Sequence, residues 1–292
     1  MNQNPRFIDL FSGIGGFHLA LHALGGECVF ACEIDKYARQ TYEKNFSSIT
    51  PSLFENDLFA ADIANVDLRG IPDYEILCAG FPCQPFSQAG YKRGFHEEKD
   101  NRGNMFFEIL KFVDQHQPNV LFLENVRHLK NHDDGRTFKT IETEIRKRGY
   151  SFNAKIVKAS DFNLPQHRPR VFMVCFHKRV QNRKDFIFPE PVPLDYFMSD
   201  VFGEPCNKSV GYTLRVGGKS SGLNDRRNWD TYMVNGRIRK ITSVEGKMMN
   251  GFPEDFDFPV SETQAMKQLG NSVAVNAIKA TAKQIFATLK EG

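Results

Sequence analysis

The 292-residue sequence predicts an α/β fold in which a mostly parallel, doubly wound sheet is joined to a small, irregular lobe. Over the first two-thirds of the chain, buried-strand patterns alternate with helical patterns, which is typical of a parallel sheet covered by helices on both faces. The alternation stops near the proline-rich stretch FPEPVPL, and the chain is then glycine-rich and basic up to about Pro259. We therefore predict a large domain over residues 1–186, a lobe over 187–260 and a helical segment over 261–292 that returns to the large domain.

The elements follow from the spacing of apolar residues. Strands are predicted at RFIDLF (6–11), CVFACE (28–33), YEILCAG (74–80), NVLFLENV (119–126), SFNAKIVKAS (151–160) and RVFMVCFH (170–177). Helices are predicted at GGFHLALHALGG (15–26), MFFEILKFVDQHQP (105–118) and GRTFKTIETEIRKRG (135–149), the last closed by Gly149. The stretch 261–289 has Ser261 and Gln264 at capping-box spacing, followed by an apolar stripe that predicts packing on the large domain.

Composition and charge argue against a membrane-spanning, secreted or disulfide-rich protein. Hydrophobic residues make up 41% and charged residues 25%, no apolar run is long enough to span a bilayer, and no secretory signal is visible. None of the six cysteines forms a C-x-x-C pair, so we expect a reducing cytoplasm, no disulfide framework and no metal site. Between Pro205 and Lys240, eight basic residues face two acidic ones, which fits either a nucleic-acid contact or a solvated surface.

A glycine-rich turn follows the first predicted strand and indicates a cofactor site. Gly13, Gly15 and Gly16 allow a tight turn at a helix N-terminus, and Glu33 ends the next strand twenty residues after Gly13, where a carboxylate binds ribose hydroxyls in doubly wound folds. The spacing departs from the dinucleotide fingerprint because position 18 is histidine, so a nucleoside cofactor without a pyrophosphate, such as S-adenosylmethionine, fits better. The alternative is a tight turn without a ligand.

Other polar residues stand at strand ends. Asp62 and Ile63 are placed at the end of a third strand, where the acid can accept a hydrogen bond from an adenine amino group. Cys83 directly follows a buried strand, in the stretch GFPCQPFSQAG, with a proline on each side that restricts the loop. This is how a nucleophile is presented, although a lone exposed cysteine is usually incidental.

The acid and the arginines complete this set. Glu124 ends the strand before Asn125 and is either a helix cap or a functional acid whose pKa burial would raise. Arg168 and Arg170 precede another buried strand, and alternate residues of an extended chain share a face, so both guanidinium groups can point into one cleft. The alternative is a surface ion pair.

Together these motifs resemble one family. DLFSGIGG, FPCQPFS, ENV, QHRPR and QLGNSV occur in the order of the motifs of bacterial C5-cytosine-specific DNA methyltransferases of the type II restriction-modification kind. The resemblance implies a Rossmann-like S-adenosylmethionine-dependent methyltransferase domain with a small DNA-recognition lobe. It also implies that the enzyme methylates C5 of a cytosine flipped out of duplex DNA and releases S-adenosylhomocysteine.

The resemblance assigns roles by position. Cys83 is the nucleophile at C6, Glu124 binds and protonates N3, and Arg170 with Arg168 holds the O2 edge and a neighbouring phosphate. The implied cofactor residues are Phe11, Gly13, Gly15, Gly16, Glu33, Ile34, Asp62, Ile63, Asn271 and Ser272. Ile34 departs from the family, which often has an aromatic residue there to stack on adenine. Candidate DNA contacts are Gln84, Lys92, Arg93, Arg215, Lys219, Arg226 and Arg227.

The resemblance also bears on partners. We expect double-stranded DNA, a monomeric protein without a membrane partner, and a bacterial cytoplasmic location, with a cognate restriction endonuclease at the same site as a candidate partner. Two alternatives stay open: an RNA (tRNA) cytosine-5 methyltransferase, which the short lobe permits, and a catalytically idle DNA-binding module. The second is disfavoured because binding alone requires neither Cys83 nor Glu124.

Overall fold

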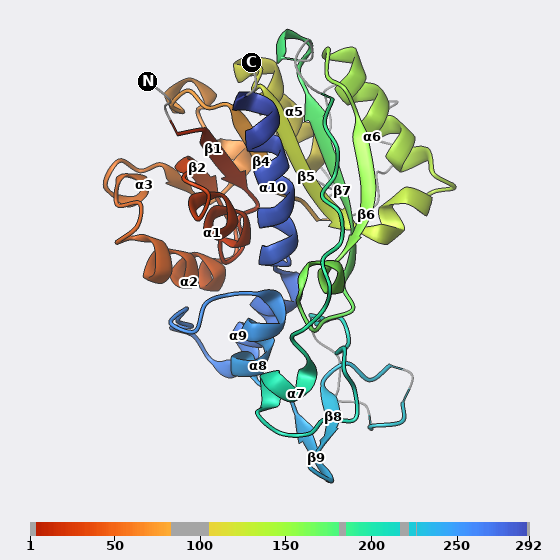
Figure 1. Cartoon of the computed structure of the whole chain (residues 1–292). Helices are drawn as coiled ribbons and strands as arrows, with labels where there is room; N and C mark the ends of the chain where they lie inside the picture. Colours follow the sequence, from red (N-terminus) through yellow and green to blue (C-terminus); the bar gives the residue numbers. More distant parts are fainter. Residues whose placement is uncertain (1–3, 83–104, 181–184, 217–221, 226, 291–292) are drawn as a thin grey trace.

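The computed structural model describes residues 4–82, 105–180, 185–216, 222–225 and 227–290 (Figure 1). Its main feature is a seven-stranded sheet with the order β3-β2-β1-β4-β5-β7-β6. The strands are β1 (Arg6–Leu10), β2 (Glu27–Cys32), β3 (Phe59–Ala60), β4 (Ile76–Gly80), β5 (Val120–Val126), β6 (Asn153–Lys158) and β7 (Pro169–Phe176). The five strands from β3 to β5 pair in parallel, and β7 pairs antiparallel with both β5 and β6. The prediction of a mostly parallel α/β fold is confirmed.

Helices cover both faces of the sheet because the central strands are apolar on both sides. In β5, Phe122 packs in the core cluster on the side of α1 (Gly16–His22) and α10 (Val275–Lys290), and Leu123 packs in the cluster on the side of α5 (Met105–His116) and α6 (Arg136–Lys147). Figure 1 shows α10 lying across the near face of the sheet beside α1. The predicted stripe of α10 is buried at Val275, Ile278, Ala282 and Ile285.

Two helix boundaries show what the sequence did and did not predict. α6 is followed by Gly149 with φ 82°, the left-handed conformation predicted for its C-terminal glycine. α2 (Lys36–Phe46), in contrast, was not predicted, although Asp35 caps it by accepting hydrogen bonds from the amides of Tyr37 and Ala38. The capping box predicted at Ser261 is not formed, because Ser261 makes no side-chain cap bond to α9 (Glu262–Asn271).

The strand order reverses between β1 and β4. The chain proceeds from β1 outward to β2 and β3 and then returns to β4 on the other side of β1, so β1 and β4 flank the point where the order reverses. Open α/β sheets bind ligands at such a point. Because β7 is antiparallel, its first residues also lie at this edge, where Arg170 pairs with Val126 at the end of β5.

The small lobe contains regular structure that the sequence analysis missed. It comprises α7 (Met198–Phe202), the hairpin β8 (Thr231–Val234) and β9 (Arg237–Lys240), and α8 (Ser243–Asn250), which lie below the sheet in Figure 1. The hairpin turns at Asn235-Gly236, both with positive φ, which is a strong hairpin signal. Met198, Tyr232 and Met249 of the lobe belong to the same apolar cluster as Ile278 of α10, so the lobe core is continuous with that of the sheet.

Candidate active site

The loop after β1 adopts the conformation that its glycines predict. Gly13 and Gly15 have φ 56° and 83°, and a Cβ atom on Gly15 would lie 2.3 Å from the ring of Phe46. A Cβ atom on Gly16 would lie 2.5 Å from Val273, which directly follows Ser272. The loop is therefore packed between α2 and the segment that joins α9 to α10, and larger residues at these two glycines would displace it.

His18, which departs from the dinucleotide fingerprint, is a core residue behind this loop. It is fully buried, its ring nitrogens lie 2.7 Å from the Tyr42 hydroxyl and 3.1 Å from Thr50 Oγ1, and it stacks on Phe46. Burial lowers the pKa of His18 to about 3, so the ring is neutral at ordinary pH. The buried ring, bonded to Tyr42 and Thr50, therefore has a structural role beside the glycine loop.

The predicted cofactor residues meet at the carboxyl ends of three adjacent strands. Phe11 follows β1, Glu33 follows β2, and Asp62 lies two residues beyond β3. Glu33 Oε2 accepts a hydrogen bond from the amide of Gly13 at 2.8 Å, and Oε1 accepts one from the amide of Asp35 at 2.7 Å. Burial raises the pKa of Glu33, and these amides oppose the rise. A carboxylate offers about four acceptor positions, so this group can also accept hydrogen bonds from ligand hydroxyls.

The rest of this edge is apolar or acidic. Ile34 is 74% exposed beside Glu33, whereas Ile63 is buried. Asp62 caps a short 3₁₀ helix through the amide of Ala64 at 3.0 Å. The edge thus offers an apolar surface and two carboxylates, which suits a nucleoside with free hydroxyls better than a pyrophosphate.

Glu124 is a buried acid on the neighbouring pair of strands. It pairs with Gly80 across β4 and β5. Arg170 is its diagonal neighbour on β7, and Arg170 Nε lies 3.1 Å from Glu124 Oε1. Burial raises the pKa of Glu124, while the charges of Arg170 and Arg168 act in the opposite direction. An acid in this setting can exist in its protonated, hydrogen-bond-donating form.

Arg168 does not share a cleft with Arg170, contrary to the sequence-based expectation. The Arg168 amide donates to the carbonyl of Gln166, so the chain turns at His167 instead of running straight. The rule that alternate residues share a face holds only for extended chain. The Arg168 side chain is 1% exposed and donates to main-chain carbonyls of Leu214, Gly270 and Ser272.

A basic cleft adjoins Glu124 and Arg170. Its volume is about 440 Å³, and its lining includes Arg170, Arg127, His128, His167 and Arg215. Arg170 and Arg215 were predicted from the sequence, whereas Arg127, His128 and His167 were not. The missed residues directly follow ENV or lie inside QHRPR, so their proximity to these motifs was the available signal. The positive charge of this cleft suits a nucleic-acid phosphate.

The remaining predicted residues have different positions. Cys83, Gln84, Lys92, Arg93, Lys219 and Arg226 lie outside the described residues, although Gly80 ends the strand that leads toward Cys83. Arg227 is exposed and forms an ion pair with Asp225 at 2.9 Å. Asn271 ends α9 and is exposed, and Ser272 is buried near Gly16.

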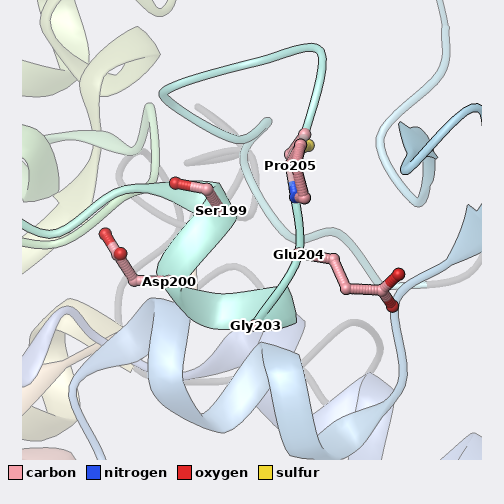
Figure 2. Close-up of a pocket in the computed structure, with 6 residues that line it drawn as sticks. Ser199, Asp200, Gly203, Glu204 and Pro205 are labelled. Carbon is pink, nitrogen blue, oxygen red and sulfur yellow. The ribbon is translucent and has the colours of Figure 1, made fainter.

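A second surface depression lies apart from this site. It has a volume of about 780 Å³, lies beside α7 in the small lobe and is lined by Ser199, Asp200, Gly203, Glu204, Pro205 and Cys206 (Figure 2). Figure 2 shows the carboxyl groups of Asp200 and Glu204 pointing away from each other. Asp200 accepts a hydrogen bond from the amide of Phe197, and Glu204 pairs with Arg239. These carboxylates stabilise the lobe and would repel a phosphate.

The described residues contain neither a membrane-spanning helix nor a cluster of metal ligands. No helix in the described ranges is long and apolar enough to cross a membrane. Within those same ranges, His, Cys, Asp and Glu side chains form no group of three or more that could hold a metal ion.

Comparisons with known proteins agree with this geometry. The family model for C-5 cytosine-specific DNA methylases matches residues 5–215 and 208–287. The chain is 35% identical to the type II methyltransferase M.HhaI of Haemophilus parahaemolyticus, covering 97% of this chain and 95% of that protein. It is 39% identical to the type II methyltransferase M.HpaII of Haemophilus parainfluenzae, covering 99% and 91%.

Solved structures share the fold. A putative DNA modification methyltransferase encoded within an Escherichia coli prophage has a TM-score of 0.75 at 19% identity, covering 99% of this chain and 100% of that one. A DNMT2 mutant of Spodoptera frugiperda has a TM-score of 0.71 at 19% identity, covering 97% and 100%. The motifs, the fold and the extent of these matches show that the chain belongs to the C-5 cytosine-specific DNA methylase family and is a DNA (cytosine-5)-methyltransferase.

Proposed function

We propose that this enzyme transfers a methyl group from S-adenosylmethionine to C5 of a cytosine flipped out of double-stranded DNA, through a covalent bond between Cys83 and C6. The observation that carries the proposal is the pair of Glu124 and Arg170. The acid is buried, faces Gly80 on the strand that leads toward Cys83, and lies on the same sheet edge as the candidate cofactor residues. A cytosine bound beside Glu124 would therefore lie between a nucleophile and a methyl donor.

The family requires an S-adenosylmethionine-type methyl donor. In our proposal Glu33 accepts hydrogen bonds from the ribose, Asp62 and Ile63 hold the adenine, and Ile34 packs on the ring as an aliphatic surface. Phe11 and the glycines of the loop line the pocket, and Asn271 and Ser272 lie at the methionine end. The donor, when bound, supplies an electrophilic methyl group on a sulfonium centre. The fit rests on the apolar and acidic character of this edge and on the free acceptor positions of Glu33.

The protein residues carry out the remaining chemistry. Glu124 donates a proton to N3 and Arg170 fixes the O2 edge, so the ring accepts electrons from the Cys83 thiolate as the Sγ–C6 bond forms. C5 then has the electron density to take the methyl group. Loss of the C5 proton to a base, return of the N3 proton to Glu124 and cleavage of the Sγ–C6 bond then restore the aromatic ring and release the thiolate. Because C6 is inaccessible within a stacked duplex, the base must leave the helix.

The basic cleft and the lobe would bind the DNA. We assign Arg127, His128, His167 and Arg215 to the phosphates around the flipped nucleotide, since phosphate contacts position DNA without reading its sequence. The lobe over residues 187–260 would determine the target sequence. Exchange of this lobe with that of a relative would then move the methylated site.

Partners and location follow from the same proposal. We infer that the enzyme acts as a monomer in a bacterial cytoplasm and that a restriction endonuclease of the same specificity is its functional counterpart. Gel filtration with light scattering tests the first inference. Digestion of unmethylated DNA by lysate of the native host, with protection of methylated DNA, tests the last.

Bisulfite sequencing of plasmid DNA from cells that express the chain tests the proposal directly. We expect methylated cytosines in one short sequence context, with none in cells that express Cys83→Ser. Methylation of RNA without methylation of plasmid DNA would instead support the RNA substrate. No methylation of either nucleic acid would refute the proposed activity.

A further inference from the structure

Two buried polar residues, Gln166 and Arg168, connect segments that are far apart in the sequence. Gln166 is 0% exposed and Arg168 is 1% exposed, on either side of the turn at His167. The side chain of His167 is exposed in the basic cleft. Within the motif QHRPR, Gln166 and Arg168 thus point into the protein, whereas His167, Pro169 and Arg170 line the cleft.

Both buried side chains bind the main chain of Leu214 in the lobe. The Leu214 amide donates to Gln166 Oε1 at 3.0 Å, and the Leu214 carbonyl accepts from Arg168 Nη1 at 3.3 Å. Gln166 Nε2 also donates to the carbonyl of Met249 at 3.0 Å and to Asn250 Oδ1 at 2.7 Å, at the end of α8. The position of Leu214 fixes that of Arg215, which lines the basic cleft.

Arg168 also holds the end of α9. Arg168 Nη2 donates to the carbonyl of Gly270 at 3.0 Å and to that of Ser272. A Cβ atom on Gly270 would lie 2.5 Å from the carbonyl carbon of Arg215, so the two main chains are in direct contact. The carbonyls that Arg168 binds therefore flank Asn271, one of the candidate cofactor residues.

The buried guanidinium group of Arg168 costs more free energy than a purely structural contact between these segments would require. No ion pair in the described part of the chain joins Arg168 to a carboxylate; its three hydrogen-bond acceptors are neutral carbonyls, and its Nε is unpartnered. Burying a charge in this way costs free energy that an apolar side chain of similar size would not. The guanidinium group does provide a rigid fork that binds two segments at once.

We propose that Gln166 and Arg168 are positioning residues that couple DNA in the basic cleft to the placement of Asn271 and Ser272 beside the cofactor. The inference rests on the proposed roles of Arg215 and of these two cofactor residues. DNA that draws the main chain at Arg215 toward a phosphate moves Leu214, and through Arg168 it moves the carbonyls on both sides of Asn271. By reciprocity, the cofactor tightens DNA binding by the same factor.

The test is a thermodynamic cycle on the full-length enzyme. The affinity for S-adenosylhomocysteine is measured without and with a duplex that contains the site found by bisulfite sequencing, and the ratio is the coupling factor. For Arg168→Met we expect the coupling factor to fall by about tenfold, within the usual range of such couplings, with less change in binary cofactor affinity. Arg168→Lys, which keeps the charge but lacks the fork, is expected to recover little of the coupling.

Arg136→Met is the matched control, because Arg136 is an exposed arginine at the start of α6. It should keep the coupling factor of the native enzyme. A native coupling factor in both Arg168 variants, together with native turnover, would overturn the proposal. A native enzyme that methylates nothing would instead refute the proposed function on which this inference rests.

A second measurement on the native enzyme is independent of whether the variants fold. In hydrogen exchange, DNA should slow the amides of residues 268–274, and the cofactor should slow those of residues 211–216. If each ligand protects only its own segment, the coupling does not run through this junction.

Discussion

Polar groups are held in different ways in two regions of the molecule. The first is the candidate cofactor edge around Glu33, and the second is the junction formed by Gln166 and Arg168 of QHRPR. At the cofactor edge, Glu33 binds the amides of Gly13 and Asp35, which are 20 and 2 residues away in the sequence. At the junction, Gln166 binds Asn250, 84 residues away, and Arg168 binds the carbonyl of Ser272, 104 residues away. The first site is built from neighbouring strand ends, whereas the second forms only when the lobe and the last helices are in place. Short motifs therefore describe the first site almost completely and the second only in part.

The largest expected effect tests whether Cys83 and the methyl donor at the candidate cofactor site act on the same cytosine. In the proposed mechanism, Cys83 adds to C6 of a target 5-fluorocytosine in duplex DNA and C5 takes the methyl group, but the fluorine cannot leave as a cation. We expect a covalent complex that survives denaturation only when S-adenosylmethionine is present. Cys83→Ser should give almost none, because a hydroxyl is far less ionised than a thiol. Peptide mapping that places the cross-link on Cys78 would overturn the assignment.

Glu124→Gln should slow methyl transfer and leave cofactor binding nearly unchanged. The amide keeps the shape of the side chain but cannot protonate N3, so we expect methyl transfer to slow by about a hundredfold or more. Cofactor affinity, measured by calorimetry, should change by less than about threefold because Glu124 lies outside the ribose and adenine positions. Unchanged turnover would reduce Glu124 to a structural residue.

Glu33→Gln should give the opposite pattern. Glutamine places an NH₂ group where Glu33 accepts hydrogen bonds from two amides, so one buried amide loses its partner. We expect cofactor affinity to fall by about tenfold or more, while DNA affinity without cofactor stays close to the native value. Equal losses in both affinities would indicate that the loop has collapsed, and far-ultraviolet circular dichroism would show this.

Two arginines of the lobe should differ in their effect on DNA binding. Arg215 lines the basic cleft, whereas Arg227 is paired with Asp225 and exposed to solvent. We expect Arg215→Met to weaken DNA binding by about tenfold at low salt and to reduce the salt dependence by about one counterion. Arg227→Met should change the affinity much less. Equal losses would mean that Arg227 leaves Asp225 to contact DNA.

The smallest expected effect is a shift in the pH profile. Burial raises the pKa of Glu124 and the charge of Arg170 opposes this rise, so Arg170→Met should raise that pKa further. Glu124 then keeps its proton to higher pH, and the alkaline limb of single-turnover methyl transfer that reports its ionisation moves to higher pH. The overall rate should fall because Arg170 no longer fixes the base. An alkaline limb that moves to lower pH would contradict the assignment of Glu124 as the acid.

Sequence reasoning succeeded where the structure depends on local pattern. The apolar runs predicted the strands that lead to Phe11 and Glu33 and the strand that carries Glu124, and the ends of parallel strands converge by topology. It failed at Arg168, because the turn at His167 is stabilised by pairing with Gly211 in the lobe, which no local pattern encodes. It also missed α8, whose Glu245 and Met249 are buried among residues of other segments.

Because β7 is antiparallel, the proline-rich stretch that follows it has to span the length of the sheet to reach the lobe. A strand of eight residues carries the chain about 26 Å away from the sheet edge where Arg170 pairs with Val126, so the chain must travel back before it can enter the lobe. Residues 185–197 make this return in extended form, anchored by Phe186 on Phe176 and by the amide of Val192 on the carbonyl of Asp161 (Figure 1). Spanning that distance requires at least about eight extended residues. The stretch that marks a domain boundary in the sequence is therefore a strap of fixed minimum length, and its prolines suit it because no neighbouring strand needs their missing amides.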